Sequence, residues 1–314
     1  MSPKRYFIIA NPAAGHGAAA RAIPRVEALC RHIGLEFDLV RTQRRGHAID
    51  LAREAALAGA GVVVAAGGDG TSNEVINGLM QAKRKRGTTS ALGILGIGRG
   101  NDFAHTVGVP KDLSAACDTL AAGFLRPIDI GRVIGGIFPE GRFFGNCVGV
   151  GFDAITTIEV MKLPRYGGFV SFFIAVMRTI FLYYKGPLVR IEMDDRSLTQ
   201  PVLLVSVMNG RRLGGGFWMA PESLPDDGLF DLCIAHEVGR LRILGMIPHF
   251  LRGTQATQPE ITMSRARRIA IIAERGVLPA QTDGEIICEG GARLDIDLLP
   301  RELDVVSAEP GRTA

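Results

Sequence analysis

The sequence lacks the features that mark membrane-spanning, exported and disulfide-bonded proteins. It contains no run of about 18 uncharged apolar residues, so we expect no segment that crosses a bilayer. The apolar run at residues 6–10 is too short for the core of a signal peptide. The five cysteines are scattered without a Cys-x-x-Cys pair, which indicates buried, reduced thiols and neither a disulfide framework nor a zinc site. We therefore expect a cytoplasmic protein.

Strong charge of either sign is also missing. The 314 residues carry a formal net charge of +4, far less than a nucleic-acid-binding protein needs, and we expect no nucleic-acid partner. A mild positive charge is compatible with a phosphate ligand or an anionic membrane surface. The chain is longer than one ordinary domain, so two domains are expected.

Residues 1–127 alternate short, wholly apolar runs with alanine-rich helical stretches. This pattern is typical of an α/β domain in which helices cover both faces of a parallel sheet. The expected strands are 6–10, 37–40, 62–66 and 92–95, and the expected helices are 21–32, 48–57 and 73–80.

After Pro127 the pattern changes to short alternating runs separated by glycine- and aspartate-rich turns. Residues 128–314 are therefore expected to form a β-rich, antiparallel, sandwich-like domain, with the extreme C-terminus free to pack back on the first domain. A ligand site is expected in the cleft between the domains. The expected strands are 128–134, 142–148, 189–193, 202–208, 230–235, 269–273 and 294–298, and the expected helices are 168–184 and 240–251.

A glycine-rich segment follows one of the expected parallel strands. Residues 67–74 read Gly-Gly-Asp-Gly-Thr-Ser-Asn-Glu and precede a helical stretch. Glycines at such a strand end let the backbone approach a ligand, and the N–H groups at the start of the next helix face an anion. Thr71, Ser72 and Asn73 add side-chain donors. The segment predicts a site for nucleotide phosphates, with a plain strand-to-helix turn as the alternative.

Two further loops follow strands of the same expected sheet. Residues 11–17 and 96–103 end the first and fourth strands, so three loops meet at one edge. The segment 15–20 also fits a dinucleotide-binding fingerprint, but the second strand ends in Arg41-Thr42 without an acidic residue for a ribose. The sequence has no Gly-x-x-x-x-Gly-Lys-Ser/Thr motif, which excludes a P-loop enzyme.

Two acidic turns stand out in the second half. Asp226-Asp227-Gly228 can coordinate Mg²⁺ through carboxylate and turn carbonyl oxygens, or form the tip of a hairpin. The element Asp283-Gly284-Glu285 offers two carboxylates as a source for a general base, or again a hairpin tip. Spacing alone leaves both alternatives open in each case.

Taken in order, these motifs resemble the diacylglycerol kinase catalytic-domain family, which includes bacterial lipid kinases and sphingosine and ceramide kinases. The resemblance spans nearly the whole chain. The Gly-Gly-Asp-Gly-Thr element alone occurs also in NAD kinases and phosphofructokinases, but the full set does not. The motifs that carry the resemblance are Asn11-Pro12…Gly15, Gly67–Glu74, Gly98–Ala104, Gly149–Asp153, Ala220–Leu229 and Asp283–Glu285.

The resemblance implies a lipid kinase that depends on ATP and Mg²⁺, with ATP between a nucleotide domain and a lipid domain. It implies a Mg²⁺ site at Asp227, with Leu224 and Leu229 as ligands through backbone oxygens, and it implies that Asp69 acts through the catalytic Mg²⁺. The nucleotide-binding residues that it implies are Asn11, Thr42, Gly67, Gly68, Asp69, Gly70, Thr71, Ser72 and Asn73. We expect Arg99 and Asn101 of the loop after the fourth strand to join them.

The resemblance also implies a general base in the element Asp283-Gly284-Glu285. We expect Asp283 to be the base with Glu285 as its partner, and the reverse assignment stays open. The base accepts the proton of the lipid hydroxyl while Mg²⁺ and loop amides hold the γ-phosphoryl group.

Two apolar helices are candidates for lipid contact. The stretch 168–184 has the composition of a core helix, with an acyl-chain path or a membrane surface as alternatives. The stretch 240–252 has the composition of an interfacial helix, although Pro248 interrupts it. The basic run 83–86 is expected to be a solvated loop, with a membrane-binding patch as the alternative. Peripheral association with the membrane that holds the lipid substrate follows from the resemblance.

Two other functions compete with a lipid kinase. An enzyme similar to NAD kinase would share the Gly-Gly-Asp-Gly loop, but the motifs of the second half favour a lipid. A non-catalytic lipid-binding protein would be expected to have lost Asp69, Asp227 or Asp283, and all three are present. Diacylglycerol, a sphingoid base, ceramide and phosphatidylglycerol all stay open as the substrate, and so does a homodimer.

Arg99 stands where the family usually has threonine in Gly-Thr-Gly-Asn-Asp. We predict that Arg99→Ala raises the KM for ATP roughly ten- to a hundredfold, because a guanidinium donates charge-assisted hydrogen bonds to phosphate. Arg99→Thr should recover part of the loss. Kinetics against ATP concentration at two salt concentrations measure the effect. Unchanged ATP kinetics in Arg99→Ala would mean that the side chain points outward to a surface carboxylate.

Overall fold

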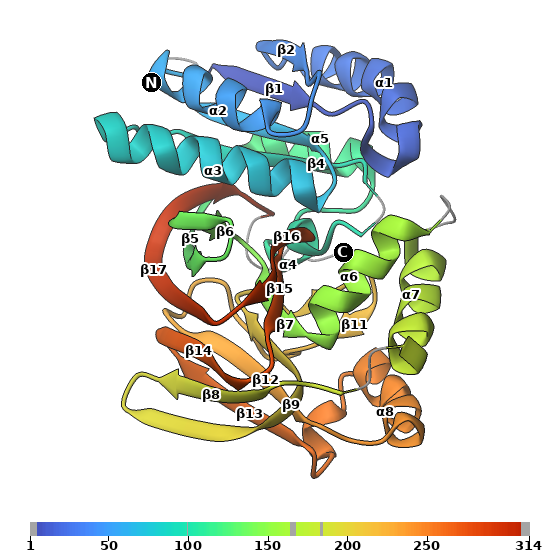
Figure 1. Ribbon diagram of the computed structural model, residues 1–314. Coiled ribbons are helices and arrows are strands. Elements are labelled where there is room, and N and C mark those ends of the chain that lie inside the picture. Colours follow the sequence, from blue (N-terminus) through green and yellow to red (C-terminus); the bar gives the residue numbers. More distant parts are fainter. Residues whose placement is uncertain (1–4, 99, 164–167, 183–184, 309–314) are drawn as a thin grey trace. The chain divides into compact units, whose positions relative to one another are not determined.

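The chain divides into two compact units. Unit 1 comprises Met1–Ile128 and Arg301–Ala314, and unit 2 comprises Asp129–Pro300. The last strand, β17 (Arg293–Val306), therefore begins in unit 2 and ends in unit 1. The computed structural model, drawn in Figure 1, describes residues 5–98, 100–163, 168–182 and 185–308.

Unit 1 is an α/β unit built on a parallel sheet. The strand order is β2–β1–β3–β4, and the end of β17 joins β4 through the parallel pair Val305–Leu92. Strand β3 is buried along its whole length, as expected for a strand covered on both faces. The four strands are β1 (Tyr6–Ala10), β2 (Phe37–Arg41), β3 (Val62–Gly67) and β4 (Ala91–Gly96).

The helices of unit 1 cover the sheet in pairs, α2 with α3 and α1 with α5. Gly78 lets α2 and α3 approach closely, because a Cβ at this position would lie 2.4 Å from the carbonyl oxygen of Ile49. The helices are α1 (Ala18–His32), α2 (His47–Leu57), α3 (Asp69–Arg86), α4 (Asp102–Thr106) and α5 (Leu113–Ala122).

The expected strands and helices of unit 1 are confirmed, but the prediction for residues 83–86 is wrong. These basic residues form the last turn of α3 and not a loop. Positive side chains are favourable at the C-terminus of a helix because they interact with its dipole. Lys83 also lies 3.1 Å from the carboxylate of Glu302. Helices α4 and α5 were not predicted, because one is short and the other is an alanine-rich stretch without a clear apolar face.

Unit 2 is an antiparallel β sandwich, as the alternating pattern predicted. The long strand β9 (Arg196–Met208) pairs with β8 through its first half and with β7 and β12 through its second half, so it contributes to both sheets. The stacked rings of Phe144 and Phe230, with centroids 5.5 Å apart, belong to the core between the sheets. The other strands are β5 (Leu125–Gly135), which starts in unit 1, and β6 (Phe138–Phe144), β7 (Cys147–Gly151), β8 (Leu188–Met193), β10 (Arg212–Leu213), β11 (Phe217–Trp218), β12 (Phe230–His236), β13 (Ile261–Ala266), β14 (Arg268–Arg275), β15 (Leu278–Thr282) and β16 (Glu285–Gly291).

Three helices pack beside strands β7, β9 and β12 and form a second apolar cluster with them. They are α6 (Phe152–Lys162), α7 (Gly168–Leu182) and α8 (Arg240–Arg252). Among the described residues, no helix combines the length and the apolar character that a membrane span requires. The predicted strand 142–148 proves to be the end of β6 and the start of β7, with a turn at Gly145-Asn146. Helix α6 was not predicted.

Candidate active site

Three loops of unit 1 meet at the carboxyl edge of its sheet, as the sequence predicted. The Asn11 side-chain amide donates to Thr71 Oγ1 at 3.1 Å. The backbone amides of Ile97 and Gly98 both donate to the carbonyl oxygen of Gly67 at 3.0 Å. The loops after β1, β3 and β4 therefore hold one another through direct hydrogen bonds.

Glycine is required where these loops touch. A Cβ on Gly67 would lie 2.3 Å from Thr71 Oγ1, and a Cβ on Gly98 would lie 2.4 Å from the Cα of Gly68. A Cβ on Gly70, in contrast, would meet open space. The backbone at the start of α3 is therefore accessible to a ligand, which suits a phosphate group.

The polar side chains of the predicted nucleotide site have different surroundings. Ser72 and Asn73 are almost fully buried in the first turns of α3, and Asn73 accepts a hydrogen bond from Asn77. Thr42 follows β2 at the same sheet edge, where its amide donates to the carbonyl oxygen of Ala10 at 2.9 Å. The structure brings these residues to one edge of the sheet, and their contact with a nucleotide stays a prediction.

Asp69 and Asn101 join the loop after β4 to the glycine-rich loop. Asp69 Oδ1 accepts the amide of Phe103 at 3.0 Å. Asn101 has a left-handed backbone (φ 52°), and its side chain donates to the carbonyl oxygens of Gly96 and Gly98 at 3.1 Å. Both predicted residues thus order the loop. Arg99 lies outside the described residues.

Glu74, the last residue of the glycine-rich motif, has a structural role that the sequence did not reveal. Its carboxylate accepts the amides of Gly46 at 2.9 Å and Ala48 at 3.1 Å. These amides belong to the first turn of α2, where an acidic group is favourable. Glu74 therefore fixes the start of α2 at the same edge.

In unit 2, the loop with Asp227 has oxygen donors that fit Mg²⁺. Asp227 Oδ1 accepts the amide of Leu229 at 3.1 Å, and Asp129 Oδ2 accepts the amide of Gly228 at 2.7 Å. Two carboxylates thus flank one short segment. Within the described part of the chain no three His, Cys, Asp or Glu side chains cluster as a metal site, so a cation here needs backbone oxygens such as those of Leu224 and Leu229.

The hairpin alternative for this loop is wrong. Strand β11 before the loop pairs with β10, and strand β12 after it pairs with β9 and β13. The buried Asp129 was missed as a member of the loop. Its signal in the sequence was a lone acid between Ile128 and Ile130 in an apolar strand.

The element Asp283-Gly284-Glu285 does form a hairpin. Thr282 pairs with Glu285, and Asp283 and Gly284 both have positive φ values (46° and 83°), which is the two-residue turn that matches strand twist. The turn keeps Asp283 buried and Glu285 partly exposed on the following strand.

The two carboxylates of this hairpin have different partners. Asp283 accepts the backbone amides of Gly145 at 3.0 Å, Asn146 at 3.2 Å and Cys147 at 2.8 Å. Glu285 forms an ion pair of 2.7 Å with the buried Arg142. Asp283 therefore ties the β15–β16 hairpin to the turn before β7.

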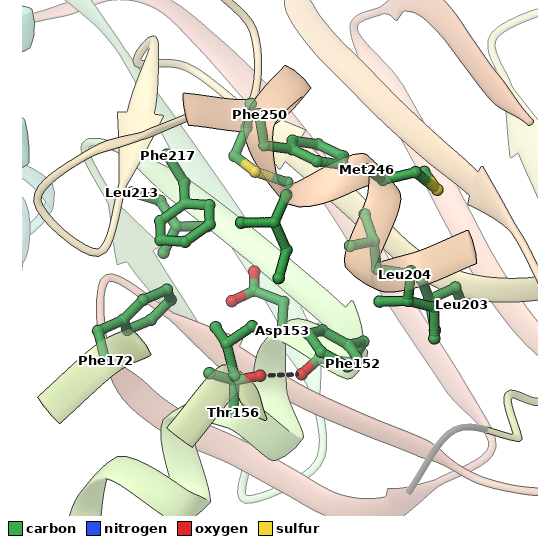
Figure 2. Close-up of a pocket in the computed structure, with 14 residues that line it drawn as sticks. Phe152, Asp153, Thr156, Phe172, Leu203, Leu204, Leu213, Phe217, Met246 and Phe250 are labelled. Atoms are coloured by element: carbon green, nitrogen blue, oxygen red, sulfur yellow. Dashed lines mark hydrogen bonds between the residues drawn. The ribbon is translucent and has the colours of Figure 1, made fainter. Parts of the chain in front are cut away.

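An apolar pocket in unit 2 lies beside this hairpin. Figure 2 shows that side chains of α6, α7 and α8 and of the neighbouring strands surround it, with the carboxylate of Asp153 among them. Two of the lining residues, Asp153 and Thr156, are polar. The pocket is lined by Phe152, Asp153, Thr156, Phe172, Val176, Leu203, Leu204, Leu213, Phe217, Met219, Ile243, Met246, Ile247 and Phe250.

Two hydrogen bonds connect the pocket to the hairpin. Gln281 Nε2 donates to Asp153 Oδ2 at 3.1 Å, and Gln281 Oε1 accepts the amide of Gly284 at 2.8 Å. Burial raises the pKa of Asp153 to about 6, and the bond from Gln281 opposes this shift. The motif Gly149–Asp153 was noted in the sequence without a role. Gln281 was missed, although a polar residue in a buried strand was its signal.

We predict that Asp153→Asn stabilises the protein increasingly as the pH rises. An acid whose native pKa is raised from 3.8 to about 6 contributes stability that is present below pH 3.8 and lost as the pH rises through 6. The gain in unfolding free energy over wild type should grow by about 1–2 kcal/mol between pH 5 and pH 8. Urea unfolding at both pH values measures it. A gain that is equal at both would contradict a buried, titrating Asp153.

Comparisons with known proteins cover both units. The family model described as "Diacylglycerol kinase catalytic domain" matches residues 5–133, and the one described as "YegS C-terminal NAD kinase beta sandwich-like domain" matches residues 146–307. The chain is 32% identical over 285 residues to a diacylglycerol kinase of Bacillus subtilis (strain 168), with 90% of each chain covered. It is 36% identical over 222 residues to the protein named "Probable lipid kinase YegS-like" of Klebsiella pneumoniae (strain 342), covering 70% of this chain and 71% of the relative.

A solved structure supports the fold. The crystal structure of a diacylglycerol kinase from Bacillus anthracis str. Sterne matches with a TM-score of 0.75 at 21% identity, and each chain is fully covered.

Proposed function

This chain belongs to the diacylglycerol kinase family of lipid kinases, and from that premise we propose that it transfers the γ-phosphoryl group of ATP to a hydroxyl of a membrane lipid. The observation that supports this most is the apolar pocket of unit 2. It suits an acyl chain, and hydrogen bonds through Gln281 connect it to the hairpin of Asp283 and Glu285. A soluble nucleotide acceptor would bring polar groups that such a lining leaves unpaired.

The glycine-rich edge of unit 1 supports ATP as the phosphoryl donor. We assign the phosphates to the backbone around Gly68 and Gly70, where the accessible start of α3 favours an anion. Asn11, Thr42 and Asn101 stand at the same edge. We also propose Arg99 as a phosphate contact, as the sequence predicted.

Mg²⁺ supports the reaction by neutralising phosphate charge when it is bound. Leu224, Asp227 and Leu229 are the proposed ligands of a Mg²⁺ ion in unit 2, with the neighbouring carboxylate of Asp129 as a further oxygen donor. Asp69 keeps its proposed role toward the catalytic Mg²⁺.

The hydrogen bonds of the hairpin favour Glu285 over Asp283 as the general base. An ionised carboxylate has about four lone-pair positions, and three of those on Asp283 accept backbone amides. Those amides would lose their partner if Asp283 moved to a substrate. Glu285 is partly exposed, and Arg142 holds its orientation. We therefore assign proton acceptance to Glu285, the reverse of the first expectation, and assign the anchoring of the turn to Asp283.

The pair of variants Glu285→Gln and Asp283→Asn tests this assignment. Glu285→Gln should lower kcat at least ~10²-fold, as expected for a lost general base, with little change in melting temperature. Asp283→Asn should lower the stability by about 1–3 kcal/mol, because an amide group cannot accept all three N–H donors. Kinetics and thermal unfolding of both variants measure the effects. If Asp283→Asn keeps the wild-type melting temperature and loses turnover while Glu285→Gln stays active, Asp283 is the base.

Peripheral contact with the membrane is proposed for the outer sides of α7 and α8. Phe181, Leu182 and Leu241 are more than half exposed although they are large and apolar. Arg240 joins the two helices by donating to the carbonyl oxygen of Phe181 at 2.9 Å, so basic and apolar groups lie together. Other side chains of the same helices line the pocket, which gives a lipid a short path from the bilayer.

Leu241→Asp should weaken co-sedimentation with anionic vesicles, and unchanged binding would rule out this surface.

Purified protein incubated with labelled ATP, Mg²⁺ and vesicles that contain one lipid each tests the proposed function. We expect label in a lipid product, with diacylglycerol, ceramide, a sphingoid base and phosphatidylglycerol compared side by side. A parallel reaction with NAD tests the soluble alternative. Label in NADP and none in any lipid would overturn the proposal, and no transfer to any acceptor would favour a non-catalytic lipid-binding protein.

A further inference from the structure

Strand β2 forms an open edge of the sheet in unit 1. Among the described residues it pairs with β1 alone, and Figure 1 shows it at the end of the sheet. An edge strand presents unpaired backbone N–H and C=O groups, which natural proteins commonly shield with lysine, proline or a bulge. The sequence of β2, Phe-Asp-Leu-Val-Arg, contains neither lysine nor proline, and its register with β1 is regular. The edge is therefore suited to accept a further strand.

The hydrogen bonds between β1 and β2 determine which backbone groups point outward. The amide of Tyr6 donates to the carbonyl oxygen of Glu36 at 3.4 Å, and the amide of Thr42 donates to that of Ala10 at 2.9 Å. Backbone groups alternate in direction along a strand, so the even-numbered residues of β2 face β1. The outward-facing donors and acceptors belong to Phe37, Leu39 and Arg41.

The same edge borders a groove between β2 and α1. The groove has a volume of about 570 Å³, and Phe37, Leu39 and Arg41 line it. Arg31 of α1 lies over the ring of Phe37, 6.0 Å from its centroid, and forms an ion pair of 3.0 Å with Glu27. Arg41 is exposed, and its guanidinium has no ion-pair partner among the residues that the structure describes. The groove thus offers an aromatic ring and a carboxylate, with an unpaired cation at the end of the strand.

We propose that the β2 edge binds a second copy of this chain through antiparallel pairing of two β2 strands. A two-fold axis perpendicular to the sheet keeps each face of the sheet on its own side, so odd-numbered residues pair with odd-numbered residues. With the axis at Leu39, this residue lies opposite its own counterpart, and Phe37 lies opposite Arg41 of the second copy. Each outward N–H group of these residues then meets an outward carbonyl oxygen.

The side chains are complementary in the same register. Arg41 of the second copy enters the groove beside the ring of Phe37, which attracts a cation, and Glu27 can be shared by Arg31 and the incoming arginine. On the other face, Asp38 is held by Arg5 at 2.7 Å and lies opposite Val40, so no like charges oppose each other. Because the symmetric pairing makes each of these contacts twice, β2 fits a second copy of itself.

Sedimentation velocity over a range of protein concentrations tests the proposal on the full chain. Wild type should form a dimer that dissociates on dilution. Arg41→Glu should raise the dissociation constant of the dimer at least ~10-fold, because the new carboxylate would face Glu27 of the second copy. The double variant Glu27→Arg with Arg41→Glu should restore the dimer. The matched control is Arg25→Glu, the same charge change at an exposed residue of α1 outside the groove.

A disulfide across the two-fold axis tests the register and does not depend on the charge variants. The Cα atoms of the two Leu39 residues should lie about 5.5 Å apart, a separation that a disulfide spans. Leu39→Cys should therefore give a covalent dimer on mild oxidation. Asp38→Cys lies opposite Val40 and should give much less. The native cysteines are all buried, so they should not compete.

Each other result overturns the proposal. A wild type that stays monomeric at every concentration would leave the edge to an extended peptide of a different protein. A dimer that Arg41→Glu does not weaken, and that Leu39→Cys does not crosslink, would use another surface. Equal weakening by Arg41→Glu and Arg25→Glu would reflect net charge and not the groove. If Arg41→Glu fails to fold, the yield of crosslinked Leu39→Cys against Asp38→Cys decides the question.

Discussion

The candidate site in unit 2 depends on the hydrogen bonds that converge on the turn between β15 and β16. The carboxylate of Asp283 accepts three consecutive backbone amides, from Gly145 to Cys147. Gln281 connects the same turn to Asp153 at the start of α6. Because all of these groups are buried or partly buried, each bond that is lost would leave a donor or acceptor without water or protein to replace it. The turn before β7, the start of α6 and the hairpin are therefore fixed together.

This constraint brings an apolar pocket and the carboxyl groups of Asp153 and Asp283 together from distant parts of the sequence. Glycines make it sterically possible: Gly149 leaves room for the carboxyl group of Asp153, and Gly284 supplies the left-handed turn. In unit 1, Gly67 and Gly98 likewise leave room where the loops after β3 and β4 touch. In both units polar side chains and amides hold the loops, and glycine lets the backbones touch.

Much of the architecture could be predicted from the sequence, because periodicity reports burial on one or both faces of a strand. The wholly apolar run of β3 and the alternating runs of unit 2 each gave the correct element. The prediction of a single strand over 142–148 was wrong, because the turn at Gly145-Asn146 is set by the distant carboxylate of Asp283 and not by local residues. Local pattern cannot report a turn that a residue 138 positions away stabilises.

Sequence motifs revealed residues that lie together only where the residues of the motifs touch one another. The glycine-rich loop of unit 1, which contacts the loops after β1 and β4, is such a case. Asp129 and Gln281 were missed because each is a single polar residue in a buried strand, a signal that becomes meaningful only when its partner is known. The spacing of Asp283 and Glu285 was compatible with the hairpin that they form. Their different partners depend on tertiary contacts, which the spacing does not reveal.

Photo-crosslinking tests the central claim, that the substrate chain lies in the pocket between α6, α7 and α8. Vesicles would contain a diacylglycerol with a diazirine on one acyl chain, and labelled peptides would be identified by mass spectrometry. In wild type, the labels should concentrate on pocket residues such as Phe172, Val176 and Met246. Val176→Trp fills the pocket, so this variant should show less labelling of the pocket and less lipid kinase activity. Labels on protein residues outside the pocket, together with a Val176→Trp variant as active as wild type, would contradict this account.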